Sequence, residues 1–229
     1  MSLCETLRGD CGELWQALHD HPFLHELADG SLAPERFRFY VEQDLFFLPE
    51  LARAVALGVA TAGDEDELRH FADEMVAVAE SEIGNNRDLL ARVVELGASD
   101  RGGGLVAAPA TLAYSGFLVA TAHRGGVLEI MTALLPCTWS YADIATGLRD
   151  GIVEHPLYTR WARYFASDDY VELIARRRRT LDERAAGIGP SRRRRLYEIF
   201  TMSTRLELAF WEMAYACEQW PDLASKEEA

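Results

Sequence analysis

Two acidic residues fall on the apolar faces of segments whose residue spacing is typical of long helices. In the helix expected over 34–60, apolar residues three and four positions apart share one face with Asp44. In the helix expected over 191–219, Glu207 lies about 200° around the axis from Arg205, on the apolar side. An ionised carboxylate is costly to bury without a partner. A structural ion pair would satisfy either group, but two inward carboxylates on separate helices favour a ligand site.

A cysteine supplies the third reactive group. Pro136 stands directly before Cys137 and is expected to end a helix over 127–135, so that a new helix over 138–148 begins beside the thiol. The free N–H groups and dipole of a helical first turn favour a thiolate. This placement predicts a nucleophile, although a cysteine packed at a helix break is the alternative.

Aromatic residues accompany these three groups along the sequence. A flat ring ligand needs such walls, with a few polar groups to recognise its edge. Taken singly, each aromatic residue is equally a core residue. The set comprises Phe47, Tyr114, Tyr141, Tyr158, Trp161, Tyr164, Phe210 and Trp211.

The elements that must position these residues are all helical, because no segment shows the sustained alternation of a strand. Gly102, Gly103 and Gly104 mark the most obvious loop, over 97–109. We expect an all-α fold, a single-domain helical bundle over residues 1–229, with frayed ends at 1–5 and 222–229. The expected helices are one following Ser2, a short one over 21–27 ending at Gly30, and then 34–60, 66–96, 110–123, 127–135, 138–148, 156–165, 170–186 and 191–219.

Charge and composition exclude several classes of partner. The formal net charge of −14 would repel nucleic acids and anionic membranes. Arginine runs at 176–179 and 192–195 suggest a nucleic-acid patch, but Glu172 and nearby acidic residues can neutralise them. No stretch approaches the roughly 20 apolar residues of a membrane span, and the first residues do not resemble a signal peptide. We therefore expect a cytoplasmic protein with no nucleic-acid or membrane partner.

Neither the cysteines nor the histidines form a metal-binding pattern. The four cysteines are widely spaced and contain no Cys-x-x-Cys pair, so we expect reduced thiols. Glu67 and His70 have the spacing used in di-iron bundles, but no second copy follows. His21 and His25 lack a clear third ligand. We expect surface or capping histidines and no metal.

Several stretches together resemble the TenA family, which includes thiaminase II and aminopyrimidine aminohydrolase. The specific ones are Pro136–Tyr141 and Glu207–Trp211, supported by Gln43–Phe47, Tyr114 and the segments at 21–23 and 155–158. The resemblance implies a haem-oxygenase-like fold without haem, assembled as a homotetramer. It also implies hydrolysis of thiamine or 4-amino-5-aminomethyl-2-methylpyrimidine to the hydroxymethyl pyrimidine, for thiamine salvage or degradation, without a cofactor.

The resemblance also assigns roles to single residues. Cys137 matches the nucleophile, Glu207 the acid/base and Asp44 the carboxylate that holds the aminopyrimidine edge. The substrate-binding walls match Phe47, Tyr114, Tyr141, Tyr164 and Phe210. Retention of the three polar groups places the chain with the cysteine-bearing branch.

Two departures from the family pattern and two rival functions remain. Phe47 stands where relatives often carry tyrosine, and Asn86 where many carry histidine. A cofactorless oxidase of the pyrroloquinoline quinone synthase type shares the fold, although histidine and arginine would be expected in its pocket. A noncatalytic pyrimidine-binding or regulatory protein would keep the affinity for ligand without needing Cys137.

Overall fold

The computed structural model describes residues 2–99 and 106–221, and within them the regular structure is entirely helical. Part of the loop predicted over 97–109, including the three glycines at 102–104, lies outside the described residues, as does the predicted frayed end at 222–229. The elements are α1 (Leu3–Asp10), α2 (Gly12–His19), α3 (Pro22–Asp29), α4 (Pro34–Thr61), α5 (Glu65–Val76), the π-helix η1 (Ala77–Glu82), α6 (Ile83–Glu95), α7 (Pro109–Arg124), α8 (Val127–Leu148), α9 (Tyr158–Phe165), α10 (Asp168–Arg184) and α11 (Pro190–Ala216). The predicted all-α fold is confirmed.

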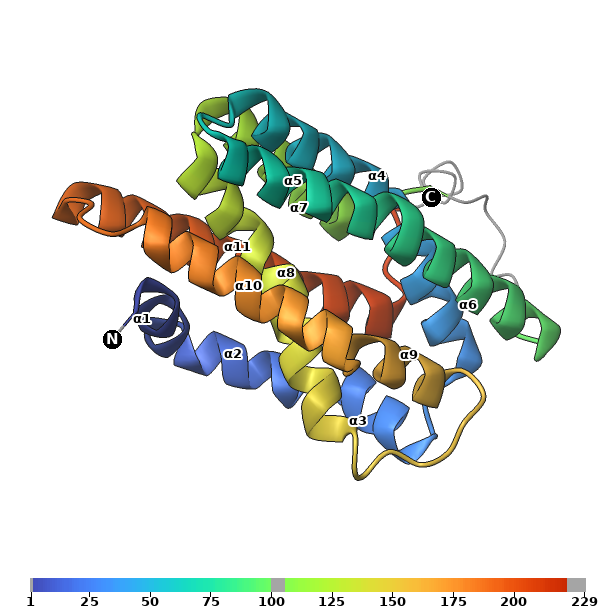
Figure 1. Cartoon of the computed structure of the whole chain (residues 1–229). Coiled ribbons are helices and arrows are strands. Elements are labelled where there is room, and N and C mark those ends of the chain that lie inside the picture. The colour runs from blue at the N-terminus through green and yellow to red at the C-terminus, as the bar shows by residue number, and fades with distance from the viewer. Residues whose placement is uncertain (1, 100–105, 222–229) are drawn as a thin grey trace, which may run out of the picture.

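The long helices form the bundle that holds the site. Helix α4 packs against α5, α6, α7 and α11, and α8 packs against α10 and α11. Figure 1 shows α5 and α6 continuing one another alongside α4. Asp44 comes from α4, Cys137 from α8 and Glu207 from α11, so the three candidate groups approach one interior from different helices.

Local sequence signals explain most helix ends. Ser2 caps α1 with a capping box that includes Glu5. Gly30 ends α3 at φ 81°, a left-handed conformation in which a residue with a Cβ is strained. Pro34 occupies the first turn of α4, where its missing N–H costs nothing. These ends match the predicted ones. The fraying predicted over 1–5 is wrong for residues 3–5, because they form the capped first turn of α1.

The predicted helix break at Pro136 is wrong. Helix α8 runs unbroken from Val127 to Leu148, with Pro136 in its interior. Every residue from Leu128 to Pro136 is buried, so packing on all sides offsets the roughly 3 kcal/mol that an interior proline costs. One consequence is that Cys137 lies in mid-helix, where no free N–H groups are available to it.

The helix predicted over 66–96 contains a feature that periodicity does not reveal. Between α5 and α6 the chain makes the π-helix η1, which ends at Glu82. A π turn carries more residues than an α turn and changes the direction of the side chains that follow. Both Glu82 and Asn86, one α-helical turn later, are buried in consequence.

Candidate active site

The Cys137 thiol and the Glu207 carboxylate are hydrogen-bonding neighbours in the interior between α8 and α11. Glu207 is only 1% exposed. Burial raises its pKa to about 7, and hydrogen bonds from Tyr114 and Cys137 limit the rise. The Oε2 atom of Glu207 has no hydrogen-bond partner among the described residues. This carboxyl group can therefore exchange a proton near neutral pH and still has an oxygen free for a ligand.

The thiol itself is protonated in the resting protein. Burial raises the pKa of Cys137 well above its usual range, and the negative charges of Glu207, Glu82 and Asp44 raise it further. Arg177 opposes the shift without reversing it. The predicted first-turn thiolate is thus wrong, because the mid-helix position removes the dipole that was to stabilise it. A base must take the proton, and Glu207 is placed to do so.

Asp44 is the second buried carboxyl group of the site. Its Oδ2 accepts a hydrogen bond of 2.5 Å from Nδ2 of Asn86 on α6. Burial raises the pKa of Asp44 to about 8, with a further rise from Glu82 and opposition from the Asn86 hydrogen bond. At neutral pH this group is mostly a neutral carboxyl, which can donate and accept hydrogen bonds at once.

Three of the predicted aromatic residues form one wall. The ring centroid of Phe47 lies 4.8 Å from that of Tyr114 and 5.9 Å from that of Phe210. The Tyr114 hydroxyl lies 3.2 Å from Oγ of Ser203, which donates to the carbonyl of Ala133 at 2.7 Å. Tyr114 also hydrogen-bonds Glu207, so this wall adjoins the proton-exchanging pair.

Tyr141 stands at the end of a chain of hydrogen bonds that the sequence did not reveal. Nε1 of Trp161 donates to the hydroxyl of Tyr40 at 3.1 Å, and that hydroxyl donates to the hydroxyl of Tyr141 at 3.3 Å. Tyr141 therefore keeps its own proton for another acceptor. The charges of Glu207 and Asp44 both raise its pKa, after burial, which places it beside the two carboxyl groups.

Tyr164 lies apart from the other predicted wall residues. Its ring contacts Phe165 and Tyr170, with centroids 4.9 and 5.8 Å away. The charge that raises its pKa, after burial, is that of Glu82. Tyr164 thus belongs to the neighbourhood of η1 and α10, at the edge of the site.

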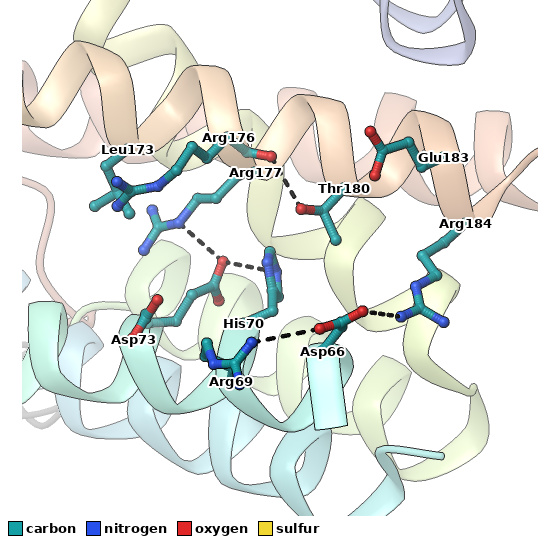
Figure 2. A pocket seen from close by; sticks show the side chains of 11 residues that line it. Asp66, Arg69, His70, Asp73, Leu173, Arg176, Arg177, Thr180, Glu183 and Arg184 are labelled. Atoms are coloured by element: carbon teal, nitrogen blue, oxygen red, sulfur yellow. Dashed lines mark hydrogen bonds and ion pairs between the residues drawn. The ribbon is translucent and has the colours of Figure 1, made fainter. Parts of the chain in front are cut away.

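Glu82 and Arg177 are the charged residues that sequence reasoning missed. Burial raises the pKa of Glu82 to about 7, with Arg177 opposing the rise. In α10, Arg177 is 6% exposed and points toward α5, where its Nε lies 2.9 Å from Oε1 of Glu74 (Figure 2). Nε2 of His70 approaches the same oxygen at 3.4 Å. Neither residue interrupts an apolar pattern as clearly as Asp44 and Glu207 do. Arg177 lies within a run of four arginines, and Glu82 lies in a segment with other acidic residues.

The remaining predictions concern histidines, metals and membranes. Nδ1 of His21 accepts a hydrogen bond from the N–H of Phe23 at the start of α3, so this histidine is a cap, as predicted. Within residues 2–99 and 106–221, no group of three His, Cys, Asp or Glu side chains could hold a metal ion. In the same residues, no helix has both the length and the apolar character that crossing a bilayer requires.

Comparison with known proteins gives the family. Residues 10–217 match the model of the TENA/THI-4/PQQC family, and the chain belongs to this family. It is 34% identical to an aminopyrimidine aminohydrolase of Halalkalibacterium halodurans, over 96% of this chain and 98% of that protein. A solved TenA homologue from P. horikoshii OT3 superposes with a TM-score of 0.82 at 32% identity, covering 94% of this chain and 99% of that one.

A more distant structure confirms the expected fold. A domain of unknown function from Shewanella denitrificans with a haem oxygenase-like fold superposes with a TM-score of 0.66, over 93% of this chain and 92% of that one. At 13% identity it shows the fold alone. The fold predicted from the family resemblance is therefore correct.

Proposed function

We propose that this chain hydrolyses the C–N bond at the 5-methylene carbon of 4-amino-2-methylpyrimidine compounds and releases the hydroxymethyl pyrimidine. The substrates would be thiamine, 4-amino-5-aminomethyl-2-methylpyrimidine or both, in thiamine salvage or degradation. The chain is an enzyme, since a relative matching 98% of its own length is named aminopyrimidine aminohydrolase. The proposal rests on one observation: the Cys137 thiol hydrogen-bonds the carboxyl group of Glu207, whose pKa is raised to about 7.

Asp44 binds the edge of the pyrimidine in this proposal. A neutral carboxyl group can donate its proton to a ring nitrogen and accept a hydrogen bond from the adjacent amino group. Its raised pKa, about 8, favours this form at neutral pH, and Asn86 fixes its orientation. The unused proton of Tyr141 can serve another ring nitrogen, and Phe47, with Phe210, can cover the ring face.

Ring addition activates the C–N bond. Glu207 takes the proton of Cys137, and the sulfur forms a bond to a ring carbon, so that aromaticity is lost and the electron pair moves to a ring nitrogen. That nitrogen is protonated or hydrogen-bonded as its charge develops. The electron pair then returns, an exocyclic methylene forms and the C–N bond breaks, so that the ammonium group of the aminomethyl compound departs as ammonia and the thiazolium of thiamine departs as a neutral thiazole. Glu207 then loses its proton, to the released ammonia or to solvent.

The second half of the reaction restores the ring and the protein. Glu207, ionised again, takes a proton from water as the oxygen bonds to the exocyclic methylene carbon. The C–S bond breaks, the ring regains its aromaticity, and Cys137 is reprotonated. One carboxyl group thus moves a proton in each half, which suits a pKa near the working pH.

The rival functions make different demands on the same residues. An oxidase of the pyrroloquinoline quinone synthase type would use histidine and arginine around its substrate. The groups proposed to contact the pyrimidine here are a thiol, carboxyls and hydroxyls, and the buried Arg177 beside them is ion-paired with Glu74. A pyrimidine-binding or regulatory protein would bind product but show no turnover. A single-domain chain, assembly as a homotetramer and a cytoplasmic location remain predictions.

Incubation of purified protein with thiamine and with the aminomethyl pyrimidine, followed by chromatography for the hydroxymethyl pyrimidine, tests the proposal. We expect turnover of at least one of the two compounds. Calorimetric binding of the product without turnover of either compound would favour the binding protein. Absence of both turnover and binding would refute a pyrimidine site altogether.

A further inference from the structure

A surface pocket adjoins the catalytic cluster between η1 and the start of α10. Its volume is ≈ 270 Å³, and its polar lining comes from Ser81, Glu82, Tyr164, Ser167, Asp169 and Tyr170. The charge of Glu82 acts on both the Cys137 thiol and Asp44, so the same carboxyl group borders the pocket and the reacting centre. A cavity of this size is near the lower end for small ligands and suits a fragment rather than a whole cofactor.

Glu82 lacks the partner that a buried carboxyl group normally has. The residue is 8% exposed, and its Oε1 finds no hydrogen-bond donor in the described part of the chain. Such an atom is costly unless a ligand or water satisfies it. The buried cation whose charge acts on Glu82 is Arg177, but its Nε is ion-paired with Glu74 of α5. Figure 2 shows Arg177 pointing toward α5. The positive charge of Arg177 is thus balanced by another carboxylate.

We propose that this pocket holds the half of the substrate that will depart, bound as an ammonium or a thiazolium before the C–N bond breaks, with Glu82 as its counter-charge. The inference rests on the proposed function, because it assigns to this pocket the group that the proposed hydrolysis releases. A primary amine on a methylene carbon is protonated at neutral pH, and a thiazolium carries a permanent charge. Both share the chemistry that a buried carboxylate recognises.

The rest of the lining fits a cation. The rings of Tyr164 and Tyr170 lie with centroids 5.8 Å apart, and aromatic faces attract cationic nitrogen. Asp169 adds negative charge at the exposed rim, where it can guide the ligand in. Among the described residues, the polar lining contains no basic side chain. This arrangement also gives Tyr164 a role on the leaving group instead of the pyrimidine ring.

Replacing Glu82 while varying the charge of the leaving group tests the inference. The variant is Glu82→Gln, and the control is Glu80→Gln, an exposed carboxylate on the same π-helix. Three compounds with one pyrimidine are compared: thiamine, the aminomethyl pyrimidine and a methoxymethyl analogue whose leaving group is neutral. For Glu82→Gln we expect KM to rise about 10-fold for a cationic substrate that the wild type hydrolyses, because one charge-assisted contact is lost. The KM of the methoxymethyl analogue and the Kd of the hydroxymethyl product should change less than about twofold.

A second variant keeps the inference testable if Glu82→Gln fails to fold. Ser81 is exposed and lines the pocket, so Ser81→Lys should fold and should weaken the aminomethyl substrate more than its methoxymethyl analogue, which is of similar size. Equal effects on charged and neutral substrates, or none in either variant, would refute the leaving-group site while leaving the hydrolase proposal intact. A matching rise in the Kd of the product would assign Glu82 to the pyrimidine instead. A wild-type protein that neither hydrolyses nor binds any pyrimidine would end both proposals.

Discussion

Asn86 donates a hydrogen bond of 2.5 Å to Oδ2 of Asp44, which ties α6 to α4 beneath the site. The other side-chain atom, Oδ1, is buried without a partner in the described structure. The amide therefore holds Asp44 in one orientation and leaves a buried acceptor for a ligand to satisfy. Many relatives are expected to carry histidine at this position, and an amide differs because it cannot take up a charge.

Removing this hydrogen bond should weaken binding of the pyrimidine. For Asn86→Ala we expect the Kd of the hydroxymethyl product to rise about 5- to 30-fold, since Asp44 loses the one side-chain donor that it has among the described residues. The pKa of Asp44 should rise further above about 8. Isothermal titration calorimetry measures the binding, with Asn85→Ala, a half-buried neighbour, as the control. An unchanged Kd would show that Asp44 needs no help from Asn86.

The rate of hydrolysis should have a bell-shaped dependence on pH. Glu207 must be ionised to take the Cys137 proton, so kcat/KM should rise as pH increases through about 7. Asp44 must be protonated to bind the ring edge, so kcat/KM should fall as pH increases through about 8. Glu207→Gln should lower kcat about 10²-fold or more and abolish the rising limb. A wild-type profile that stays flat between about pH 6 and 9, a range that includes both pKa values, would contradict both assignments.

The same carboxyl groups should make the protein less stable at alkaline pH. The pKa values of Asp44, Glu82 and Glu207 in the folded protein are raised above their usual 3.8 and 4.5. The folded state therefore binds more protons than the unfolded state between about pH 4 and 8, and the free energy of unfolding falls as pH rises through this window. Asp44→Asn removes one such charge. We expect it to stabilise the protein by about 1–3 kcal/mol at pH 8 and by little at pH 4, in denaturant titrations. Destabilisation at pH 8 would show that Asp44 is paired in the folded state.

Replacing Glu207 should make the alkylation of Cys137 faster, even though the enzyme loses activity. The negative charge of Glu207 raises the pKa of the thiol, after burial, so Glu207→Gln should lower that pKa while activity is lost. Iodoacetamide at alkaline pH should then label Cys137 faster in the variant than in the wild type. Mass spectrometry after brief labelling measures the rate, with the buried Cys4 and Cys11 as internal references. Slower labelling in the variant would mean that the carboxylate stabilises the thiolate.

The sequence identified the residues that interrupt a periodic pattern. Asp44 and Glu207 are recognisable because each stands among apolar residues at helical spacing, and both prove buried. Helix starts at Ser2 and Pro34 follow from capping chemistry that acts within one turn. Local rules of this kind operate over a few residues and need no knowledge of the packing.

The errors concern features that depend on packing. Pro136 ends helices in isolation, but a helix buried on all sides continues through it, and the expected thiolate is lost with the break. The π-helix that buries Glu82 arises within a segment of ordinary helical pattern. Arg177 lies in a run of four arginines, and only the fold determines which of them points inward to Glu74.

The central claim is that Cys137 acts as a nucleophile, and Cys137→Ser tests it most directly. Serine has nearly the same shape but ionises far less readily, so ring addition should fail while the site still binds its ligand. Steady-state kinetics on the aminomethyl pyrimidine and on thiamine would be compared with calorimetric binding of the hydroxymethyl product. The account predicts a fall in kcat of about 10²-fold or more with the Kd of the product changed less than about threefold. Turnover by Cys137→Ser at the wild-type rate would contradict the covalent mechanism.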